Sequence, residues 1–288
     1  MDKVVSYEDS VHVVDRSVFP RCITADILKE IKELTVREDD VWLCCFPKSG
    51  TKWCASIIYH VLSLRGLLDT KTTDKEIGMP IEINFPIESV LRDFPNARLR
   101  HHVIAEWQSP RILTSHLEVR RLPDKIFTRK PKVIYVMRNP KDSAVSMYNY
   151  QPPSCPYVLK WETVCQTYLH GEFAFGPWWD HVRGYWGHRN EDNFLILSYE
   201  NMKQDPASAV QKISNHLGVT LTDNEVRGVV EATSFESMKK RAVNTPLHRH
   251  FRTGQVGNWK NYFTVAQSEA YDAKVERFCQ ETGITFQF

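Results

Sequence analysis

No hydrophobic run in this 288-residue sequence is long enough to cross a membrane. The most apolar stretch, Ile57–Leu64, is short and is interrupted by His60, whereas a transmembrane helix needs about 20 consecutive apolar residues. The first residues contain no apolar signal core and carry acidic side chains at Asp2, Glu8 and Asp9. We therefore expect no membrane association and a cytoplasmic location.

A charge excess and paired cysteine motifs are also missing. The 37 Lys and Arg residues nearly balance the 35 Asp and Glu residues, which leaves a net charge of +2. This balance excludes a globally basic nucleic-acid binder, but it allows a local basic pocket. None of the 7 cysteines has the CxxC spacing of a zinc site, so we expect buried free thiols in a reducing compartment.

The chain has no internal repeat, no low-complexity segment and no linker rich in Gly and Ser, which predicts one domain over residues 1–288. Short apolar runs at Val41–Phe46, Val133–Met137 and Phe194–Tyr199 are typical of strands buried on both faces. Helical patterns such as Trp53–Leu64 lie between them. This alternation predicts an α/β fold in which helices flank a central parallel sheet, with ligands bound beyond the carboxyl ends of its strands.

The loop after the first predicted strand has the features of an anion site. It joins the strand to a helix through Pro47–Trp53 (PKSGTKW), and a glycine turn before a helix N-terminus offers N–H groups and positive partial charge to phosphate or sulfate. Within the loop, two lysines add positive charge and two hydroxyl groups add hydrogen-bond donors: Lys48, Lys52, Ser49 and Thr51. The GxxxxGK[ST] pattern of a Walker A loop is missing, and no acidic residue is obviously placed beside the loop to hold magnesium. On this loop alone, an ordinary capped turn between strand and helix is the alternative.

A second basic residue, Arg138, directly follows the predicted strand Val133–Met137. An arginine at the carboxyl end of such a strand can hold a phosphate group through two parallel hydrogen bonds. Ser146 lies eight residues farther on, two turns into the next predicted helix. Taken alone, Arg138 could equally be a solvated surface charge.

Together these segments resemble the cytosolic sulfotransferases, which transfer a sulfuryl group from 3′-phosphoadenosine 5′-phosphosulfate (PAPS) to a hydroxyl or amine. The matching segments occur in the family's order between Phe46 and Glu269, and six or more in order are far more specific than any one. In chain order they are Phe46–Trp53, Thr114–Leu117 (TSHL), Arg138–Asp142 (RNPKD) with Ser146, Gly176–His181 (GPWWDH), Tyr199–Pro206 (YENMKQDP), Thr233–Lys239 (TSFESMK) and Arg252–Lys260 (RTGQVGNWK).

The resemblance implies a phosphosulfate-binding strand–loop–helix and a donor site spread over several segments. The first loop would hold the 5′-phosphosulfate, Trp53 would stack on the adenine, and Arg138 with Ser146 would bind the 3′-phosphate. The implied donor-site residues are Lys48, Ser49, Gly50, Thr51, Lys52, Trp53, Arg138, Ser146, Tyr199, Thr233, Phe235, Arg252, Thr253 and Gly254. No metal is expected, because the sulfuryl group carries less charge than a phosphoryl group, and lysines with helix-end amides could suffice.

The resemblance also implies the residues that act in the transfer. His116 would be the general base, since a histidine of near-neutral pKa suits removal of the acceptor proton. Lys48 would neutralise charge on the bridging oxygen as the nucleotide leaves. Spacing adds only that His116 ends a short strand-like run, Ile112–Ser115, in a chain with 11 histidines.

The chain departs from the family's pattern at several positions. Thr114 stands where many members have lysine, which leaves the acceptor class open. Glu118 replaces a usual proline, Lys52 a usual threonine, and Asn258 a usual aspartate. Thr253 replaces a usual lysine, and the lost charge contact with the 3′-phosphate would cost about 1 kcal/mol of donor binding.

Aromatic side chains mark the predicted acceptor pocket, at Phe85, Trp107 and Tyr150, and the proline-rich Gln151–Pro156 (QPPSCP) is predicted as a loop over the site. Aromatic walls favour a flat, apolar acceptor such as a phenol, a catecholamine or a steroid. For each aromatic residue singly, packing in the core is the alternative.

Lys260–Glu269 (KNYFTVAQSE) matches the family's homodimer motif KxxxTVxxxE in full. The resemblance therefore implies a homodimer, while a capped amphipathic helix is the alternative for this segment. Two other functions stay open. One is an ATP-dependent phosphotransferase, which the missing Walker A loop and magnesium ligands disfavour. The other is a non-catalytic member of the same fold that binds nucleotide or acceptor, which Thr114, Glu118 and Thr253 leave possible.

Overall fold

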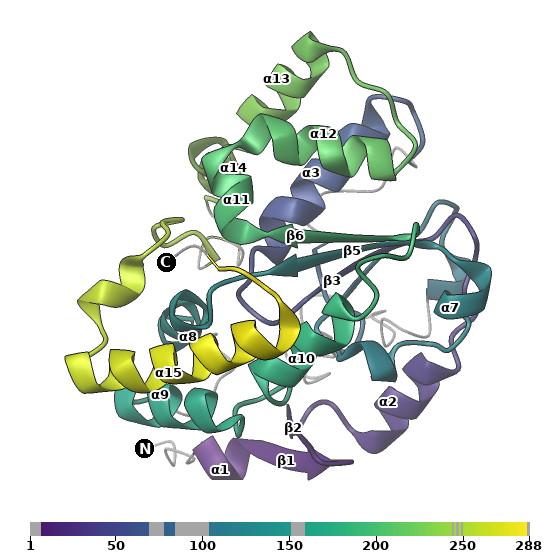
Figure 1. Cartoon of the computed structure of the whole chain (residues 1–288). Coiled ribbons are helices and arrows are strands. Elements are labelled where there is room, and N and C mark those ends of the chain that lie inside the picture. Colours follow the sequence, from purple (N-terminus) through teal and green to yellow (C-terminus); the bar gives the residue numbers. More distant parts are fainter. Residues whose placement is uncertain are drawn as a thin grey trace.

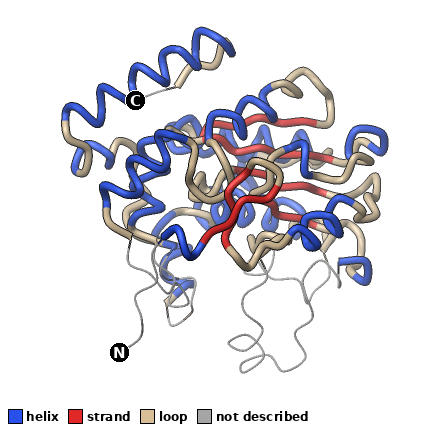
Figure 2. The backbone as a smooth tube through the Cα atoms, turned by 90° about the horizontal axis from the view of Figure 1, so that it is seen from below, coloured by secondary structure: helices blue, strands red, loops and turns tan. Residues whose placement is uncertain are grey.

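A computed structural model describes residues 7–68, 78–83, 104–150, 159–243, 245, 248 and 250–286. Its centre is a parallel sheet, and Figure 2 shows the strands as neighbouring red tubes with helices around them. Their order across the sheet is β4 (Ile112–Ser115), β3 (Val41–Cys45), β5 (Lys132–Met137) and β6 (Phe194–Ser198). Every neighbouring pair is parallel, which confirms the predicted fold class.

Alternate residues of the strands point to opposite faces of the sheet, as the period of two requires. In β3, Trp42 and Cys44 join one hydrophobic cluster, whereas Val41, Leu43 and Cys45 join the other. Both faces are therefore apolar and covered, which explains why the strands read as continuous hydrophobic runs.

Helices cover the two faces in separate groups, and Figure 1 shows one group above the sheet and the other below it. The upper helices are α3 (Thr51–Ser63), α11 (Tyr199–Gln204), α12 (Pro206–His216) and α13 (Asp223–Ala232), followed by α14 (Phe235–Ala242). The lower helices are α2 (Ala25–Lys32), α8 (Pro140–Tyr148), α9 (Trp161–His170), α10 (Trp178–Trp186) and α15 (Val265–Thr282). The helix predicted after the first strand corresponds to α3.

Smaller elements complete the chain around these layers. A short helix, α1 (Tyr7–Ser10), leads into a two-stranded antiparallel hairpin. The remaining elements are β1 (Val11–Val14), β2 (Ser17–Pro20), α7 (Ile126–Arg129) and the 3₁₀ helices η1 (Ile104–Glu106), η2 (Val119–Arg121) and η4 (Asn258–Asn261). None of the helices within the described ranges combines the length and hydropathy that a membrane span requires.

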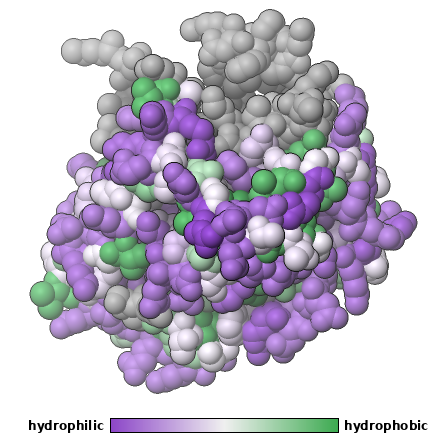
Figure 3. Space-filling view, turned by 90° about the horizontal axis from the view of Figure 1, so that it is seen from above, coloured by the Kyte–Doolittle hydropathy of each residue, from purple (hydrophilic) through white to green (hydrophobic). Residues whose placement is uncertain are grey.

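The upper face of the molecule is mainly polar where its residues are described (Figure 3). Figure 3 shows hydrophilic side chains over most of the coloured upper face, with apolar ones only in small groups. The described cysteines are free, and four of them are buried, as expected: Cys44, Cys45, Cys54 and Cys165. Cys22 and Cys279 are instead partly exposed.

A buried ion pair joins the amino ends of β3 and β4. Asp40 directly precedes β3 and Arg111 directly precedes β4, and their side chains are 0% and 1% exposed. The Arg111 Nε and Nη2 atoms donate to the two Asp40 carboxylate oxygens at 2.7 and 2.6 Å. Arg111 Nη2 also donates to the Thr35 carbonyl oxygen at 2.7 Å, so each charge is both paired and hydrogen-bonded.

We predict that Asp40→Ala lowers the free energy of unfolding by about 3–5 kcal/mol, because it leaves the Arg111 guanidinium buried without its counter-charge. Urea denaturation of the two proteins measures this difference. The control is Asp124→Ala, which breaks the exposed Lys32–Asp124 pair at 2.6 Å and should cost at most about 1 kcal/mol. Equal stability losses in the two variants would contradict the prediction.

Candidate active site

The carboxyl ends of the four parallel strands meet at one edge of the sheet. The segment after each strand supplies a candidate residue to this edge: the loop from Phe46 to Gly50 after β3, His116 after β4, Arg138 after β5 and Tyr199 after β6. The parallel order of the sheet thus brings together the segments that the sequence motifs singled out, at the edge where ligands of such sheets bind.

The loop after β3 turns sharply through two residues in the left-handed region, Lys48 with φ 69° and Gly50 with φ 106°. Helix α3 begins at Thr51, and its N-cap residue Gly50 supplies no side-chain cap. The first N–H groups of a helix have no partner within the helix, so this end offers donors and positive partial charge to an anion. The predicted strand–loop–helix is present.

Basic side chains gather around this loop. The Arg138 Nη1 atom donates to the Lys48 carbonyl oxygen at 2.9 Å, and the Lys52 ammonium group donates to the Gly78 carbonyl oxygen at 2.7 Å. Burial, reinforced by the positive charges of Arg138, Lys52 and Arg252, lowers the pKa of Lys48 to about 7. A buried lysine beside several other cations is suited to a multiply charged anionic ligand.

Arg138 is nearly buried, and its Nε atom has no hydrogen-bond partner among the described residues. Its guanidinium carbon lies 4.3 Å from the centre of the Tyr199 ring. Its Nη2 atom donates to the Gln255 carbonyl oxygen at 3.3 Å. An unsatisfied buried donor is costly, so Arg138 retains capacity for an acceptor such as a phosphate oxygen.

The Tyr199 ring lies between the first loop and the segment Arg252–Lys260. A Cβ atom at Gly50 would lie 2.7 Å from Tyr199 Cδ2, and one at Gly254 would lie 2.5 Å from Phe235 Cδ2. The Tyr199 hydroxyl donates to the Gly254 carbonyl oxygen at 3.4 Å, and Trp53 packs edge-on to Tyr199 at 5.6 Å between ring centres. Both positions therefore need glycine, because an added Cβ atom would meet an aromatic ring. The Tyr199 ring contacts both the Trp53 ring and the Arg138 guanidinium group.

His116 is 8% exposed and lies directly after β4. Its Nδ1 atom is 2.8 Å from the Cys45 carbonyl oxygen. Because a carbonyl oxygen can only accept, Nδ1 carries the hydrogen and Nε2 keeps its lone pair. Burial, with smaller contributions from His181, Lys52 and Lys48, lowers the pKa of His116 to about 3. The imidazole is therefore neutral near pH 7 and able to accept a proton at Nε2.

Carboxylates near the site bind main-chain amides and hold its segments together. Asp142 accepts hydrogen bonds from the Gly257 and Trp259 amides at 2.7 and 3.0 Å. Glu200 accepts one from the Asn139 amide at 2.9 Å. The segments that begin at Arg138, Tyr199 and Arg252 are thereby tied to one another. Asp142 and Glu200 had no predicted role, although both lie inside the matching motifs.

Tyr150 and His250 lie beside the first loop. The Lys48 Nζ atom is 3.7 Å from the centre of the Tyr150 ring, and the Tyr150 hydroxyl is 3.2 Å from His250 Nε2. Burial, reinforced by the charges of Lys48, Lys52 and His116, lowers the pKa of His250 to about 2. His250 was not predicted from the sequence, in which its place two residues before Arg252 is its one signal.

Four further predictions remain to be placed: Trp107, Ser146, Thr233, and Phe85 with the loop Gln151–Pro156. Trp107 does not join this edge: it precedes β4, and its carbonyl oxygen accepts from Arg37 Nη1 at 2.8 Å near the amino end of β3. Ser146 lies on α8, and Thr233 ends α13 with its hydroxyl bound to Val229. Phe85 and the predicted loop Gln151–Pro156 lie outside the described residues.

Comparisons with known proteins agree with this geometry. The family model described as the sulfotransferase domain matches residues 38–283. The chain is 34% identical over 263 residues to human Sulfotransferase 2A1, covering 86% of this chain and 87% of that protein. It is 31% identical over 292 residues to human Sulfotransferase 1C2, covering 91% of this chain and 90% of that protein.

Solved structures of sulfotransferases and of retinol dehydratase are also similar to this chain. The mouse sulfotransferase SULT7A1, complexed with PAP, superposes with a TM-score of 0.80 at 28% identity and 95% coverage of both chains. Retinol dehydratase, in complex with androsterone and the inactive cofactor PAP, has a TM-score of 0.76 at 20% identity, with 94% of this chain and 89% of that chain covered. At 20% identity, the likeness to retinol dehydratase shows a shared fold alone.

We predict that Gly50→Ala destabilises the protein by about 1–3 kcal/mol, because it places a Cβ atom in a left-handed conformation and against the Tyr199 ring. The matched control is Gly228→Ala in α13, where nothing lies within 4 Å of the added carbon and where alanine should add about 0.5–1 kcal/mol of stability. Urea denaturation measures both effects. A Gly50→Ala protein as stable as the parent would show that the loop does not need this geometry.

Proposed function

The chain belongs to the sulfotransferase family, and we propose that it moves a sulfuryl group from PAPS to a hydroxyl or amine of a small aromatic acceptor, with His116 as the general base. The observation that carries the base assignment is the neutral, buried imidazole of His116. Its Nδ1 atom is bound to Cys45, and its unprotonated Nε2 atom is left for the acceptor proton. The family relationship carries the assignment of the donor.

The residues of this chain suit a nucleotide with charge at both ends. We assign the 5′-phosphosulfate to the loop and helix end from Lys48 to Trp53. We assign the 3′-phosphate to Arg138, whose Nε–H group can still donate a hydrogen bond, together with Arg252 and Ser146. We assign the adenosine to the surface formed by the following residues: Trp53, Tyr199, Thr233 and Phe235. The PAP complex of the related mouse enzyme supports this assignment.

The chemistry follows from the positions of two side chains. In an in-line transfer the acceptor oxygen forms a bond to sulfur while the bond from sulfur to the bridging phosphate oxygen breaks. His116 Nε2 takes the acceptor proton, and 3′-phosphoadenosine 5′-phosphate (PAP) leaves. Lys48, on the loop assigned to the phosphosulfate, neutralises the negative charge that develops on the bridging oxygen.

Aromatic side chains near His116 support an aromatic acceptor. Phe175 packs edge-on against His116 with ring centres 5.7 Å apart, and Tyr150 lies over Lys48. A flat ring placed between such walls can present a hydroxyl group to His116. Trp107 is not part of this proposal, because it lies near the other edge of the sheet.

The homodimer, the domain boundaries and the cytoplasmic location stay predictions. The segment Lys260–Glu269 begins in η4 and continues into α15, where Val265 is 75% exposed. An apolar side chain so exposed would suit a contact with a second copy of the chain.

We predict that His116→Asn lowers turnover by about 10²–10⁴-fold, because the acceptor proton loses its base. PAP binding should stay within about twofold of the parent value, since His116 does not belong to the donor site; PAP-induced thermal stabilisation measures it. The control is His188→Asn, which changes a histidine paired with Glu191 on the surface. Normal turnover in His116→Asn would refute the assignment of the base, and PAP binding without any turnover by the parent protein would favour a non-catalytic role.

We predict that PAP binding takes up as much as one proton near pH 8. The pKa of Lys48 is lowered from 10.5 to about 7 in the free protein, and an anionic ligand raises it again. The complex then binds more protons, so the affinity for PAP falls as the pH rises from about 7 to 10. Calorimetry in two buffers of different ionisation enthalpy measures the uptake. Lys48→Arg, which stays charged, should abolish it, and the same uptake in that variant would contradict the prediction.

A further inference from the structure

The main chain of His116 is held on both sides by buried side chains. The His116 amide donates to Glu82 Oε1 at 2.7 Å, and the His116 carbonyl oxygen lies 3.0 Å from His181 Nε2. With the bond from the ring to Cys45, both main-chain polar groups and one ring nitrogen are fixed. We propose that Glu82 and His181 are positioning residues that aim the Nε2 atom of His116 at the acceptor, a role that rests on the proposed function of His116.

Glu82 reaches His116 from a segment that runs beside β4. The Ile81 amide donates to the Thr114 carbonyl oxygen at 2.8 Å, and the Glu82 side chain is fully buried. Its second oxygen accepts from the Ser115 hydroxyl at 3.1 Å. A buried carboxylate is costly unless it is hydrogen-bonded, and bonds from N–H and O–H donors to an ionised acceptor are the strong ones. Glu82 therefore fixes two successive residues at the end of β4.

His181 holds the other side of His116 through a defined tautomer. The His116 carbonyl oxygen can only accept, so His181 Nε2 carries the hydrogen. The Nδ1 atom of His181 then accepts from the Tyr135 hydroxyl, 2.8 Å away. Burial lowers the pKa of His181 to about 4, which keeps the ring neutral and this arrangement intact near pH 7. Tyr135 lies on β5 and His181 on α10, so the sheet and a helix both brace His116.

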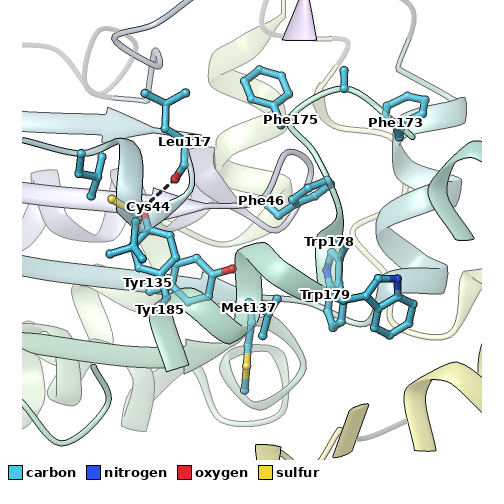
Figure 4. Close-up of a cluster of buried hydrophobic side chains, with 14 of the residues drawn as sticks. Cys44, Phe46, Leu117, Tyr135, Met137, Phe173, Phe175, Trp178, Trp179 and Tyr185 are labelled. Atoms are coloured by element: carbon cyan, nitrogen blue, oxygen red, sulfur yellow. Dashed lines mark hydrogen bonds between the residues drawn. The ribbon is translucent and has the colours of Figure 1, made fainter. Parts of the chain in front are cut away.

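The next residue is held in the same way. The Tyr185 hydroxyl donates to the Leu117 carbonyl oxygen at 2.8 Å, which Figure 4 shows as a dashed line. The rings of Tyr135 and Tyr185 stack with centres 4.1 Å apart. Figure 4 also shows Phe46 on the side of these rings toward Phe175 and Trp178. Phe46 packs edge-on to His181 at 5.3 Å, so the support of His116 reaches back to the first loop.

Loss of a contact that positions His116 and loss of a contact that binds a ligand have different effects on kcat, KM and Kd. A misplacement of a catalytic group by about 1 Å can cost about 10²-fold in rate. The hydrogen bonds given above for Glu82 and His181 go to Ser115, His116 and Tyr135, and these three residues are not assigned to the donor. Loss of either support should therefore lower kcat without changing the affinity for PAP or the KM for the acceptor. A general loss of structure would instead change all three quantities.

The first experiment compares Glu82→Ala with Glu82→Gln. The alanine variant should lower kcat about 10–100-fold, with the KM for a phenolic acceptor and the Kd for PAP within about twofold of the parent values. The glutamine variant can still accept the His116 hydrogen bond through its amide oxygen, and it should recover most of kcat. Normal kcat in the alanine variant would overturn the proposal. A loss in the glutamine variant as large as in the alanine variant would also overturn it, because the charge rather than the hydrogen bond would then be responsible.

The second experiment removes one hydroxyl group and keeps the ring. Tyr135→Phe breaks the hydrogen bond to His181 Nδ1 and should lower kcat about 3–10-fold at unchanged Kd for PAP. The matched control is Tyr271→Phe, which removes a buried hydroxyl on α15 that donates to the Cys165 carbonyl oxygen at 2.9 Å instead of to a histidine. Equal kcat values in these two variants would overturn the role of His181, even if Glu82→Ala does not fold.

The outcomes also separate this proposal from the one on which it rests. If His116→Asn abolishes turnover while Glu82→Ala and Tyr135→Phe turn over normally, the general base stands and the positioning residues are refuted. If His116→Asn turns over normally, both proposals are refuted.

Discussion

The repulsion among positive charges at one edge of the sheet sets the character of the site. Lys48, Lys52, Arg138 and Arg252 act on the same small volume, and their charges reinforce the burial that lowers the pKa of Lys48 to about 7. Such repulsion destabilises the free protein and is relieved when an anion binds. The nearby carboxylates of Asp142 and Glu200 accept hydrogen bonds from main-chain amides. These two carboxylates therefore hold the backbone of the site in place through hydrogen bonds to main-chain amides.

The parallel sheet is what makes this gathering possible. Segments that lie far apart in the chain follow strands that end side by side, so each of them delivers its side chains to the same edge. The buried Arg111–Asp40 pair joins two of these strands at their opposite ends. Stability and ligand binding thus rest on different edges of one sheet.

The sequence predicts the strands and the turn from β3 into α3 well, because a buried parallel strand and a glycine turn before a helix leave local patterns. Phe46 ends one such pattern, and the structure places its strand and helix α3 as expected. Contacts between distant segments leave no such pattern. Glu82 binds His116 across 34 positions of the chain, and nothing in the spacing of its segment indicates this. Trp107 was assigned to the acceptor wall on residue type alone, which does not reveal the edge of the sheet at which a side chain lies.

The same cations connect donor binding with the basicity of His116. Burial is the largest cause of its low pKa of about 3, and the charges of Lys52 and Lys48 lower it further. An anionic donor on the first loop offsets those two charges, since the donor lies close to both lysines in the proposed site. The pKa values of Lys48 and His116 then rise together. In the proposed mechanism, Lys48 would thereby regain the positive charge assigned to it beside the bridging oxygen, and His116 would become a stronger base when a sulfuryl group is present to be transferred.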